Sequence, residues 1–566
     1  METIIERKTC KNCCADFTIT QKDMEFYEKI SPVFEWKKYQ IPTPTLCPDC
    51  RQQRRLAFRN ERNLYKRKCD ATGKEIISMY SPDKKTKVYT EDFWWSDKWD
   101  SLDYGIDFDP KKSFFQQLQE LFIAVPQPPL INHYTTHENS NYANYSGYLK
   151  NCYLVYECWN CENLFYGENS RHIENSLDMS ISTRCQKCYF CFNVFDCYNL
   201  CYSTNSTNCS DSYYLQNCDD CKFCYNCENL SHRSYCIENR EYSQEEYFEK
   251  IKKLPRGYDS DLYQHISSKL PRIYMHGMGN ENVTGDYIFH SKDVSDSYHV
   301  KNLENGKYCS YLSSSSKRSS DCYDYDYFWW VQKIYESVTV GGISEQVYFS
   351  LNTWELAYQN MYCNMCHTSK NLFGCVWLKG KQYCILNKQY TKDEYERLVP
   401  QIMEHMKSRG EWWEFFPTSM SPFGYNETIA QQHFPLEKDQ VLFQGHNWSD
   451  YEIPFPKVDK IIAAQKLPKD ISDIPDDILN WAIECEVSKK PFRIIPQELE
   501  FYRKHGLPIP KLHPEERHKQ RMKLRNPQKL YKRSCGNCRK SITTTYTPER
   551  VEEVFCEECF NKKIYG

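Results

Sequence analysis

The sequence predicts a mainly β protein with short helices, in which a Cys- and Tyr-rich parallel β-solenoid is flanked by two related zinc-ribbon modules. Three observations support this fold class. Paired cysteines stand near both ends, a 12-residue period runs through the middle, and the two end segments align with each other. The chain has 566 residues, which is enough for several separate hydrophobic cores.

The 31 cysteines are the most unusual feature of the composition. Short secreted chains use many cysteines for disulfides, but here the count is odd and the start, METIIERKTCKNC, lacks the apolar core of a signal peptide. We interpret the cysteines as reduced thiols and metal thiolates. Because no run approaches the roughly 18 apolar residues of a membrane helix, we expect a cytoplasmic protein without a membrane partner.

Two C-x2-C pairs near each end predict structural zinc sites. Zinc takes four ligands in tetrahedral geometry, and a C-x2-C turn lets two thiolates face one ion. The C-terminal spacing, C-x2-C-x17-C-x2-C, is typical of a ribbon, and the N-terminal set has a longer loop. We expect two structural Zn²⁺ ions, one in a module over residues 1–100 and one in a module over 481–566. Their ligands would be Cys10, Cys13, Cys47 and Cys50, and Cys535, Cys538, Cys556 and Cys559.

The two ends align as copies of one module with two potential metal sites. The separation between Cys10 and Phe26 equals that between Cys485 and Phe501, and the run LYKR occurs at 64–67 and 530–533. In the first module the downstream site reads Cys69, Thr72, Thr90 and Phe93, which cannot bind zinc. In the second module the upstream site reads Cys485, Ser488, His513 and Glu516. Cys485, His513 and Glu516 could still contact a metal, so that degenerate site stays open.

The run TCKNCCADFTITQKDMEFYEKI and the later LCPDCRQQRR resemble the bacterial family called "probable zinc-binding domain". The resemblance covers roughly residues 7–60 and, in degraded form, 482–525. The whole layout also resembles uncharacterised zinc-ribbon and repeat proteins of candidate phyla radiation bacteria. The resemblance implies a zinc-ribbon fold and a metal, but no reaction.

A 12-residue period predicts the parallel β-solenoid. Residues that recur in one column are Cys152, Leu164, Ser176, Cys188, Leu200, Ser212, Cys224 and Cys236. Small or apolar residues at a fixed period suit coils that bury their inward side chains against neighbouring coils. We expect a first array over 132–256 and a second, irregular array over 283–410, each ending in a helical cap that starts with a capping box. Spacing leaves open whether one period makes a full coil or half of a larger one.

Two segments have more specialised compositions. The Pro-rich residues 411–480 are interpreted as an extended connector. Residues 218–227 read C-x2-C-x2-C-x2-C, which resembles an iron–sulfur ligand run. Cys221 and Cys224 also occupy columns where other units have small or apolar residues, which favours packing over a metal cluster, with disulfides as a third reading.

The segments 51–68 and 517–533 are strongly basic and carry the leading functional hypothesis. Clustered cations next to aromatic residues suit sequence-tolerant binding of RNA or DNA phosphates and bases. The candidate residues are Arg51, Arg54, Arg55, Arg59, Arg62, Lys66 and Arg67, and Arg517, Arg521, Lys523, Arg525, Lys532 and Arg533. The alternative is that these cations pair with acidic faces of the same protein.

Two other function classes remain. The Tyr-rich solenoid surface suits a protein-binding scaffold, because Tyr supplies contact area with little loss of entropy. A carbohydrate-active or metal-cluster protein is the third reading, based on the closely spaced Asp321, Asp324 and Asp326. No phosphate loop, nucleophile elbow or H-E-x-x-H motif is present, so we expect a binding protein and not an enzyme.

Overall fold

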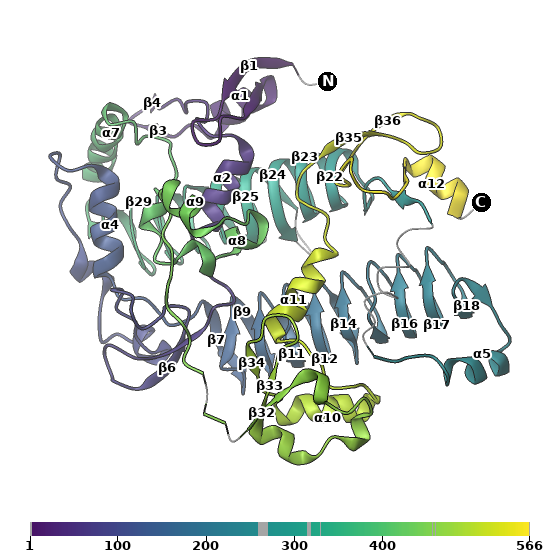
Figure 1. Ribbon diagram of the computed structural model, residues 1–566. Helices are drawn as coiled ribbons and strands as arrows, with labels where there is room; N and C mark the ends of the chain where they lie inside the picture. Colours follow the sequence, from purple (N-terminus) through teal and green to yellow (C-terminus); the bar gives the residue numbers. More distant parts are fainter. Residues whose placement is uncertain are drawn as a thin grey trace.

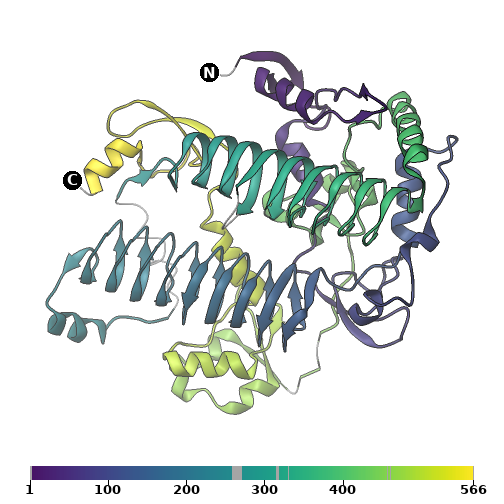
Figure 2. The same ribbon diagram turned by 180° about the vertical axis from the view of Figure 1, so that it is seen from behind.

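Two parallel β-solenoids lie side by side and form the body of the protein (Figures 1 and 2). The computed structural model describes residues 3–257, 270–313, 318–328, 330–455, 457–458 and 460–564. Residues from both ends of the chain pack on the solenoids. In Figure 1 the N-terminal module lies above the second solenoid. The predicted fold class is therefore confirmed. No helix in these ranges is both long and apolar enough to cross a membrane.

The first solenoid stacks its strands in parallel until a final antiparallel turn. Its strands are β7 (Asn132–Glu138), β8 (Tyr142–Asn144), β9 (Ser146–Lys150), β10 (Tyr153–Tyr156), β11 (Trp159–Phe165), β12 (Arg171–Ser180), β13 (Thr183–Gln186), β14 (Tyr189–Phe192), β15 (Tyr198–Cys201), β16 (Ser210–Gln216), β17 (Lys222–Glu228), β18 (Ser234–Ile237) and β19 (Arg240–Glu241). Helix α5 (Gln244–Ile251) follows and packs against β18. Its N-terminus has the capping box of Ser243 and Glu246.

The second solenoid has the same construction. Its strands are β21 (Gly277–Met278), β22 (Glu281–Phe289), β23 (Lys292–Lys301), β24 (Leu303–Ser313), β25 (Ser319–Phe328), β26 (Val331–Val338), β27 (Ser344–Tyr348), β28 (Tyr358–Met361), β29 (Lys370–Phe373), β30 (Gln382–Ile385) and β31 (Lys388–Gln389). Helix α7 (Lys392–Ser408) packs against β30 and begins with the capping box of Thr391 and Glu394.

One coil of the first solenoid corresponds to one full period of the repeat, which answers the question that spacing left open. Leu164 pairs with Ser176, and Glu162 pairs with Glu174. Within a coil, every third residue has a positive φ, as at Asn151 (52°), Leu154 (51°), Glu157 (54°) and Asn160 (56°). Each such residue turns the chain. Four segments of three residues, here called triplets, therefore close one coil. The left-handed conformation costs a non-glycine residue about 1–2 kcal/mol, which the hydrogen bonds between coils offset.

The residue after each turn points into the solenoid. Cys152, Val155, Cys158, Cys161 and Leu164 are examples, and all of them are buried. The cysteine thiols donate hydrogen bonds to carbonyl groups of the wall, as Cys158 Sγ does to the Tyr156 carbonyl at 3.3 Å. Cysteine therefore acts here as a small apolar side chain with a weak donor.

The second solenoid looks irregular in sequence because some of its coils carry extra residues. Leu372 pairs with Cys384 at the regular 12-residue step. The pairs of Gly306 with Cys322 and of Ile334 with Val347 each span a longer step. The parallel pairing of neighbouring coils continues on both sides of these longer steps.

The two solenoids run in opposite directions. Tyr287, at the start of the second, donates from its hydroxyl to Asn205 Oδ1 near the end of the first, at 3.0 Å. His133, at the start of the first, lies 3.5 Å from the Glu355 carboxylate near the end of the second. Contacts that join an early coil of one solenoid to a late coil of the other require antiparallel axes, as Figures 1 and 2 show.

The two end modules have matching elements. The first contains β1 (Ile4–Thr9), β2 (Asp16–Thr20), α1 (Gln21–Ile30), β3 (Val33–Phe34), β4 (Lys37–Lys38), α2 (Pro48–Leu56), β5 (Tyr65–Lys68), β6 (Glu75–Ser78) and α3 (Glu91–Trp94), and α4 (Phe114–Ala124) follows. The second contains β33 (Trp481–Glu484), β34 (Pro491–Phe492), α10 (Pro496–His505), α11 (Pro514–Lys523), β35 (Tyr531–Ser534), β36 (Ser541–Thr544), β37 (Val554–Phe555) and α12 (Glu557–Ile564). Helices α1 and α2 thus correspond to α10 and α11.

The segment between α7 and the second module follows an irregular path. It includes α8 (Ile429–His433), α9 (Lys438–Phe443) and β32 (Lys460–Ala463). Its aromatic residues Phe415 and Phe416 are buried and pack against Phe58 of the first module. This burial anchors the segment to the body of the protein.

Candidate metal centres and the docking of the two modules

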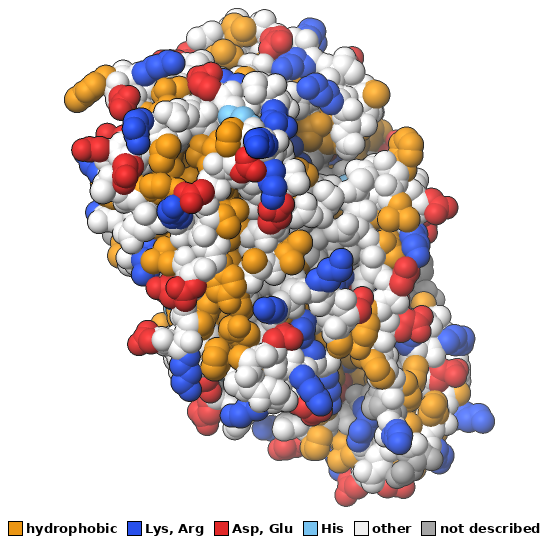
Figure 3. Space-filling model, turned by 90° about the vertical axis from the view of Figure 1, so that its left-hand side faces the viewer, with side chains coloured by type: hydrophobic (Ala, Val, Ile, Leu, Met, Phe, Trp, Pro, Cys, Tyr) orange, Lys and Arg blue, Asp and Glu red, His pale blue; other side chains and the backbone are white. Residues whose placement is uncertain are grey.

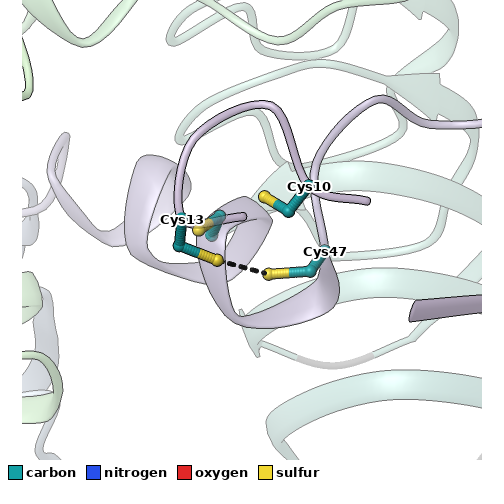
Figure 4. Close-up of side chains that lie close together, drawn as sticks. Cys10, Cys13 and Cys47 are labelled. Atoms are coloured by element: carbon teal, nitrogen blue, oxygen red, sulfur yellow. Dashed lines mark hydrogen bonds between the residues drawn. The ribbon is translucent and has the colours of Figure 1, made fainter. Parts of the chain in front are cut away.

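Four cysteine thiols converge in the first module. Cys10 and Cys13 come from the turn after β1, Cys47 is the N-cap of α2, and Cys50 lies in its first turn. All four sulfur atoms lie within 4.8 Å of one another, and Cys13 Sγ is 3.6 Å from Cys47 Sγ (Figure 4). Zinc–sulfur bonds of about 2.3 Å in tetrahedral geometry place sulfur atoms about 3.8 Å apart. The cluster therefore has the size of a metal site.

The second module repeats this arrangement. Cys535, Cys538, Cys556 and Cys559 also lie within 4.8 Å of one another, and Cys538 Sγ is 3.8 Å from Cys556 Sγ. Burial alone would raise the pKa of Cys535, but backbone N–H groups, first that of Cys556, lower it to about 6. In the first module, a hydrogen bond from Cys50 is the main cause that lowers the pKa of Cys47 to about 5. In each cluster one cysteine, Cys47 or Cys535, thus favours the thiolate, the form that binds metal.

An asparagine supports each cluster, and the sequence analysis did not identify it. Asn12 Nδ2 donates to Cys50 Sγ at 3.4 Å, and Asn537 Nδ2 donates to Cys559 Sγ at 3.3 Å. Both asparagines occupy the third position of a C-x-N-C knuckle. Such outer contacts orient metal ligands and stabilise their negative charge. The shared C-x-N-C spelling was the signal that could have revealed them.

The two degenerate sites keep the shape of a knuckle. A residue with positive φ ends each of the four knuckles, at Cys14, Gly73, Lys489 and Arg539. In the second module, His513 Nδ1 accepts the backbone N–H of Glu515 at 3.1 Å, which makes His513 the cap of α11.

The candidate ligands of that degenerate site are not gathered around one point. The Glu516 carboxylate pairs with Lys519 at 2.8 Å. Within the described part of the chain, the groups that could hold a metal are the two four-cysteine clusters, so neither Cys485, His513 and Glu516 nor the run from Cys218 to Cys227 forms one.

The arginines of α2 point into the second solenoid. Arg51 lies 2.9 Å from Asp324, and Arg55 lies 2.8 Å from Asp326. Arg54 pairs with Glu336 at 2.8 Å. The side chains of Arg55, Asp324 and Asp326 are 0% exposed, so the centre of this network is removed from water.

The arginines of α11 make equivalent contacts with the first solenoid. Arg517 lies 2.8 Å from Asp178 and 3.3 Å from Glu498, and Arg521 lies 2.6 Å from the other oxygen of Asp178. Beyond the end of α11, Arg525 donates to the Tyr311 hydroxyl of the second solenoid at 2.7 Å. The two helices therefore use matching positions to bind different solenoids.

Two further arginines lie between the solenoids. Arg59 pairs with Glu61 and with Glu157 of the first solenoid, and its guanidinium group lies 3.9 Å from the ring centres of Tyr145 and Tyr327. Arg62 pairs with Glu168 at 3.0 Å and with Glu515 of the second module at 2.9 Å. Arg59 thus joins the first module to both solenoids, and Arg62 joins it to the first solenoid and to the second module.

Few of the candidate nucleic-acid residues remain available to an external phosphate. Arg67 pairs with Asp70 at 3.0 Å, and Arg533 donates to the carbonyl groups of Thr547 and Glu552. Lys66, Lys523 and Lys532 are exposed. On the face in Figure 3, basic and acidic side chains are interspersed.

The carboxylates that suggested a catalytic groove are paired. Asp324 and Asp326 bind arginines of α2, and Asp321 lies 2.7 Å from Lys29 Nζ. A carboxylate held between arginines in the protein interior is not free to act on a sugar.

No protein-family model matches this chain, and no curated protein matches it. Eight chains of solved structures match, among them one described as a "putative acetyltransferase from Desulfovibrio desulfuricans G20". It shares 7% identity, and the match covers 49% of this chain and 81% of that one, with a TM-score of 0.10. A similarity this weak supports no statement about fold or function.

Proposed function

We propose that this protein is a zinc-stabilised scaffold for a protein partner. Two Zn²⁺ ions, held by the two four-cysteine clusters, would fix the turns around α2 in the first module and around α12 in the second. Helices α2 and α11 hold the antiparallel solenoids together. The ions would have a structural task, because four thiolates leave no position open for a substrate.

The inward orientation of the arginines is the observation that carries this proposal. Charges of opposite sign that are buried together serve internal cohesion, since a phosphate could reach them only if the modules separated from the solenoids. The outer faces of the solenoids remain accessible. Tyr148, Tyr198 and Tyr358 are 53%, 39% and 40% exposed, and tyrosine is enriched in protein-binding surfaces.

Binding of RNA or DNA is the second candidate, and exposed Lys66, Lys523 and Lys532 favour it. Three lysines would give weak binding, because the slope of log affinity against log salt concentration grows with the number of phosphates that the protein neutralises. The affinity for nucleic acid and its salt dependence therefore distinguish this hypothesis from the scaffold.

One set of experiments separates the two functions. Fluorescence anisotropy with single-stranded RNA and duplex DNA, across a salt series, should show at most weak binding. Capture of partners from nuclease-treated lysate should retain a defined protein, which a Tyr148→Ser/Tyr198→Ser double variant loses. A Lys66→Ala variant is the matched control and should retain it. Tight, steeply salt-dependent nucleic-acid binding would overturn the scaffold proposal.

A further inference from the structure

The first solenoid begins with a strand that has one neighbour. Its last coil is closed by the antiparallel strand β19 and by α5. In contrast, β7 pairs with β9 on one side and with no other strand of the described structure. Even that pairing is interrupted, because the register shifts between His133 and His137. Residues 134–136 therefore lie at a sheet edge, where an added strand can pair.

A groove of about 390 Å³ lies between β6 and β7, at the lower left of Figure 1. The two strands approach each other where the N–H of Met79 donates to the Pro129 carbonyl at 2.9 Å, and beyond that contact they do not pair. Binding pockets commonly have volumes of about 300–1,000 Å³. A ligand can reach the lining, because Tyr134 and His137 are half-buried and Glu75 is exposed.

The groove is acidic. Among the described residues, its lining contains the carboxyl groups of Glu75, Glu91 and Asp92 and one lysine, Lys66. No lysine or arginine in the described part of the chain forms an ion pair with Glu91 or Asp92. Burial, and then the charge of Asp92, raises the pKa of Glu91 to about 8. A cation placed beside these two carboxyl groups would stabilise the charge of both.

An aromatic pair adjoins the two carboxyl groups. Tyr134 stacks on Trp95 with ring centres 6.2 Å apart, and Trp95 is 38% exposed. Burial, and then the charges of Asp92 and Glu91, raises the pKa of Tyr134, so its side chain lies close to both. An arginine guanidinium stacks on aromatic faces and pairs with carboxylates through its planar fork. This combination of groups suits arginine better than lysine.

We propose that the groove binds an extended peptide segment that carries an arginine. The peptide backbone pairs with the free edge of β7 at residues 134–136. The guanidinium group of the peptide lies against Tyr134 and binds the carboxylates of Glu91 and Asp92. This site goes beyond the proposed scaffold surface, because the exposed tyrosines of that surface do not line the groove.

The test uses the full-length, zinc-loaded protein and the fluorescein-labelled peptide acetyl-Thr-Val-Arg-Val-Thr-amide. Fluorescence anisotropy should give a dissociation constant below about 100 µM for this arginine peptide. A glutamine peptide, with glutamine in place of the arginine, should bind at least about tenfold more weakly, because it lacks the charge.

Two N-methylated forms of the arginine peptide test the strand pairing. Methyl groups on both valine nitrogens block one edge of the added strand, and methyl groups on the arginine and last threonine nitrogens block the other. One form should therefore lose at least about tenfold in affinity, whereas the other should bind like the parent peptide.

Matched protein variants locate the site. Asp92→Asn should weaken binding of the arginine peptide at least about fivefold and that of the glutamine peptide by less than about twofold. Asp97→Asn alters an exposed carboxylate of the same segment outside the groove, and it should leave both affinities unchanged. The Tyr148→Ser/Tyr198→Ser variant should also keep the arginine peptide, so failure of the scaffold proposal and failure of this one are distinguishable.

The proposal is overturned if the arginine peptide does not bind, if the Asp92 and Asp97 variants lose affinity to the same extent, or if both N-methylated forms bind like the parent. Analytical ultracentrifugation tests a different occupant. A dimer that Asp92→Asn dissociates would assign the groove to a second copy of this chain and would likewise overturn the peptide site.

Discussion

Arg55 and Arg521 occupy equivalent positions in the two modules, and each is completely buried against aspartates of a different solenoid. Arg55 of the first module binds the second solenoid, whereas Arg521 of the second module binds the first. The segments that follow the helices of these two arginines make the opposite contacts: the one in the first module contacts the first solenoid, and the one in the second module contacts the second solenoid. Asn144, at the start of the first solenoid, donates to the Asn60 carbonyl at 3.0 Å, and Thr545 of the second module donates to Asp286, at the start of the second solenoid, at 2.6 Å.

This crossed docking explains how the chain closes on itself. The first module precedes both solenoids and the second follows them, yet each contacts both. The second module therefore completes the start of the second solenoid, although Thr545 and Asp286 are 259 positions apart along the chain. We expect the following four outcomes from this arrangement.

The purified protein should contain two zinc ions per chain. Cys10→Ala and Cys535→Ala should each reduce the content to one, because each removes one of four ligands. Cys69→Ser is the control and should keep two, since Cys69 stands alone in its degenerate site. Inductively coupled plasma mass spectrometry provides the measurement. Two ions retained in either alanine variant would contradict this assignment.

Replacing Arg55 should strongly destabilise the protein. Arg55→Met leaves Asp324 and Asp326 buried with less compensating charge, and loss of one partner from a buried ion pair costs about 3–5 kcal/mol. Lys66→Met, at an exposed position of the same module, should change stability by less than about 0.5 kcal/mol. Guanidinium-induced unfolding measures both variants. Equal midpoints for the two would argue against the arginine clamp.

The cysteines inside the solenoid should tolerate serine. Cys188 Sγ donates to the Gln186 carbonyl at 3.4 Å, and Ser176 Oγ, one coil earlier in the same column, donates to the Glu174 carbonyl at 2.8 Å. Cys188→Ser should therefore cost less than about 1.5 kcal/mol. Cys188→Phe should cost more, because it overpacks the coil. If thermal unfolding shows equal losses, the thiol has a role beyond packing.

Stability should depend on the ionisation of Glu91. Burial, and then the charge of Asp92, raises the pKa of Glu91 to about 8, above its ordinary value near 4.5. Between these values the folded state binds more protons than the unfolded state, so this group makes stability fall as pH rises. Glu91→Gln removes the effect.

The melting temperature of Glu91→Gln, relative to the unaltered protein, should therefore increase between pH 5 and pH 8.5. Asp103→Asn, at an exposed carboxylate, is the control and should show no such trend. A difference for Glu91→Gln that stays constant over this range would show that Glu91 titrates normally.

Much of the architecture could be predicted because it depends on local repetition. The 12-residue columns identified the solenoid, since every coil places equivalent residues in equivalent environments. The spacing of the cysteine pairs identified both clusters. A finer signal was also present, because cysteines at 185, 188 and 191 and from 218 to 227 recur every third residue. That period marks the four triplets of one coil.

The orientation of the basic segments could not be predicted. An arginine at every fourth position of a helix forms one face whether that face meets water, a phosphate or a carboxylate. The sequence alone determined that such a face exists at 51–55 and 517–521. Only the tertiary structure decided that Asp324, Asp326 and Asp178 face it, because these residues lie about 270 to 340 positions away along the chain. Long-range pairing of buried charges depends on how the solenoids stack, and no local pattern records that.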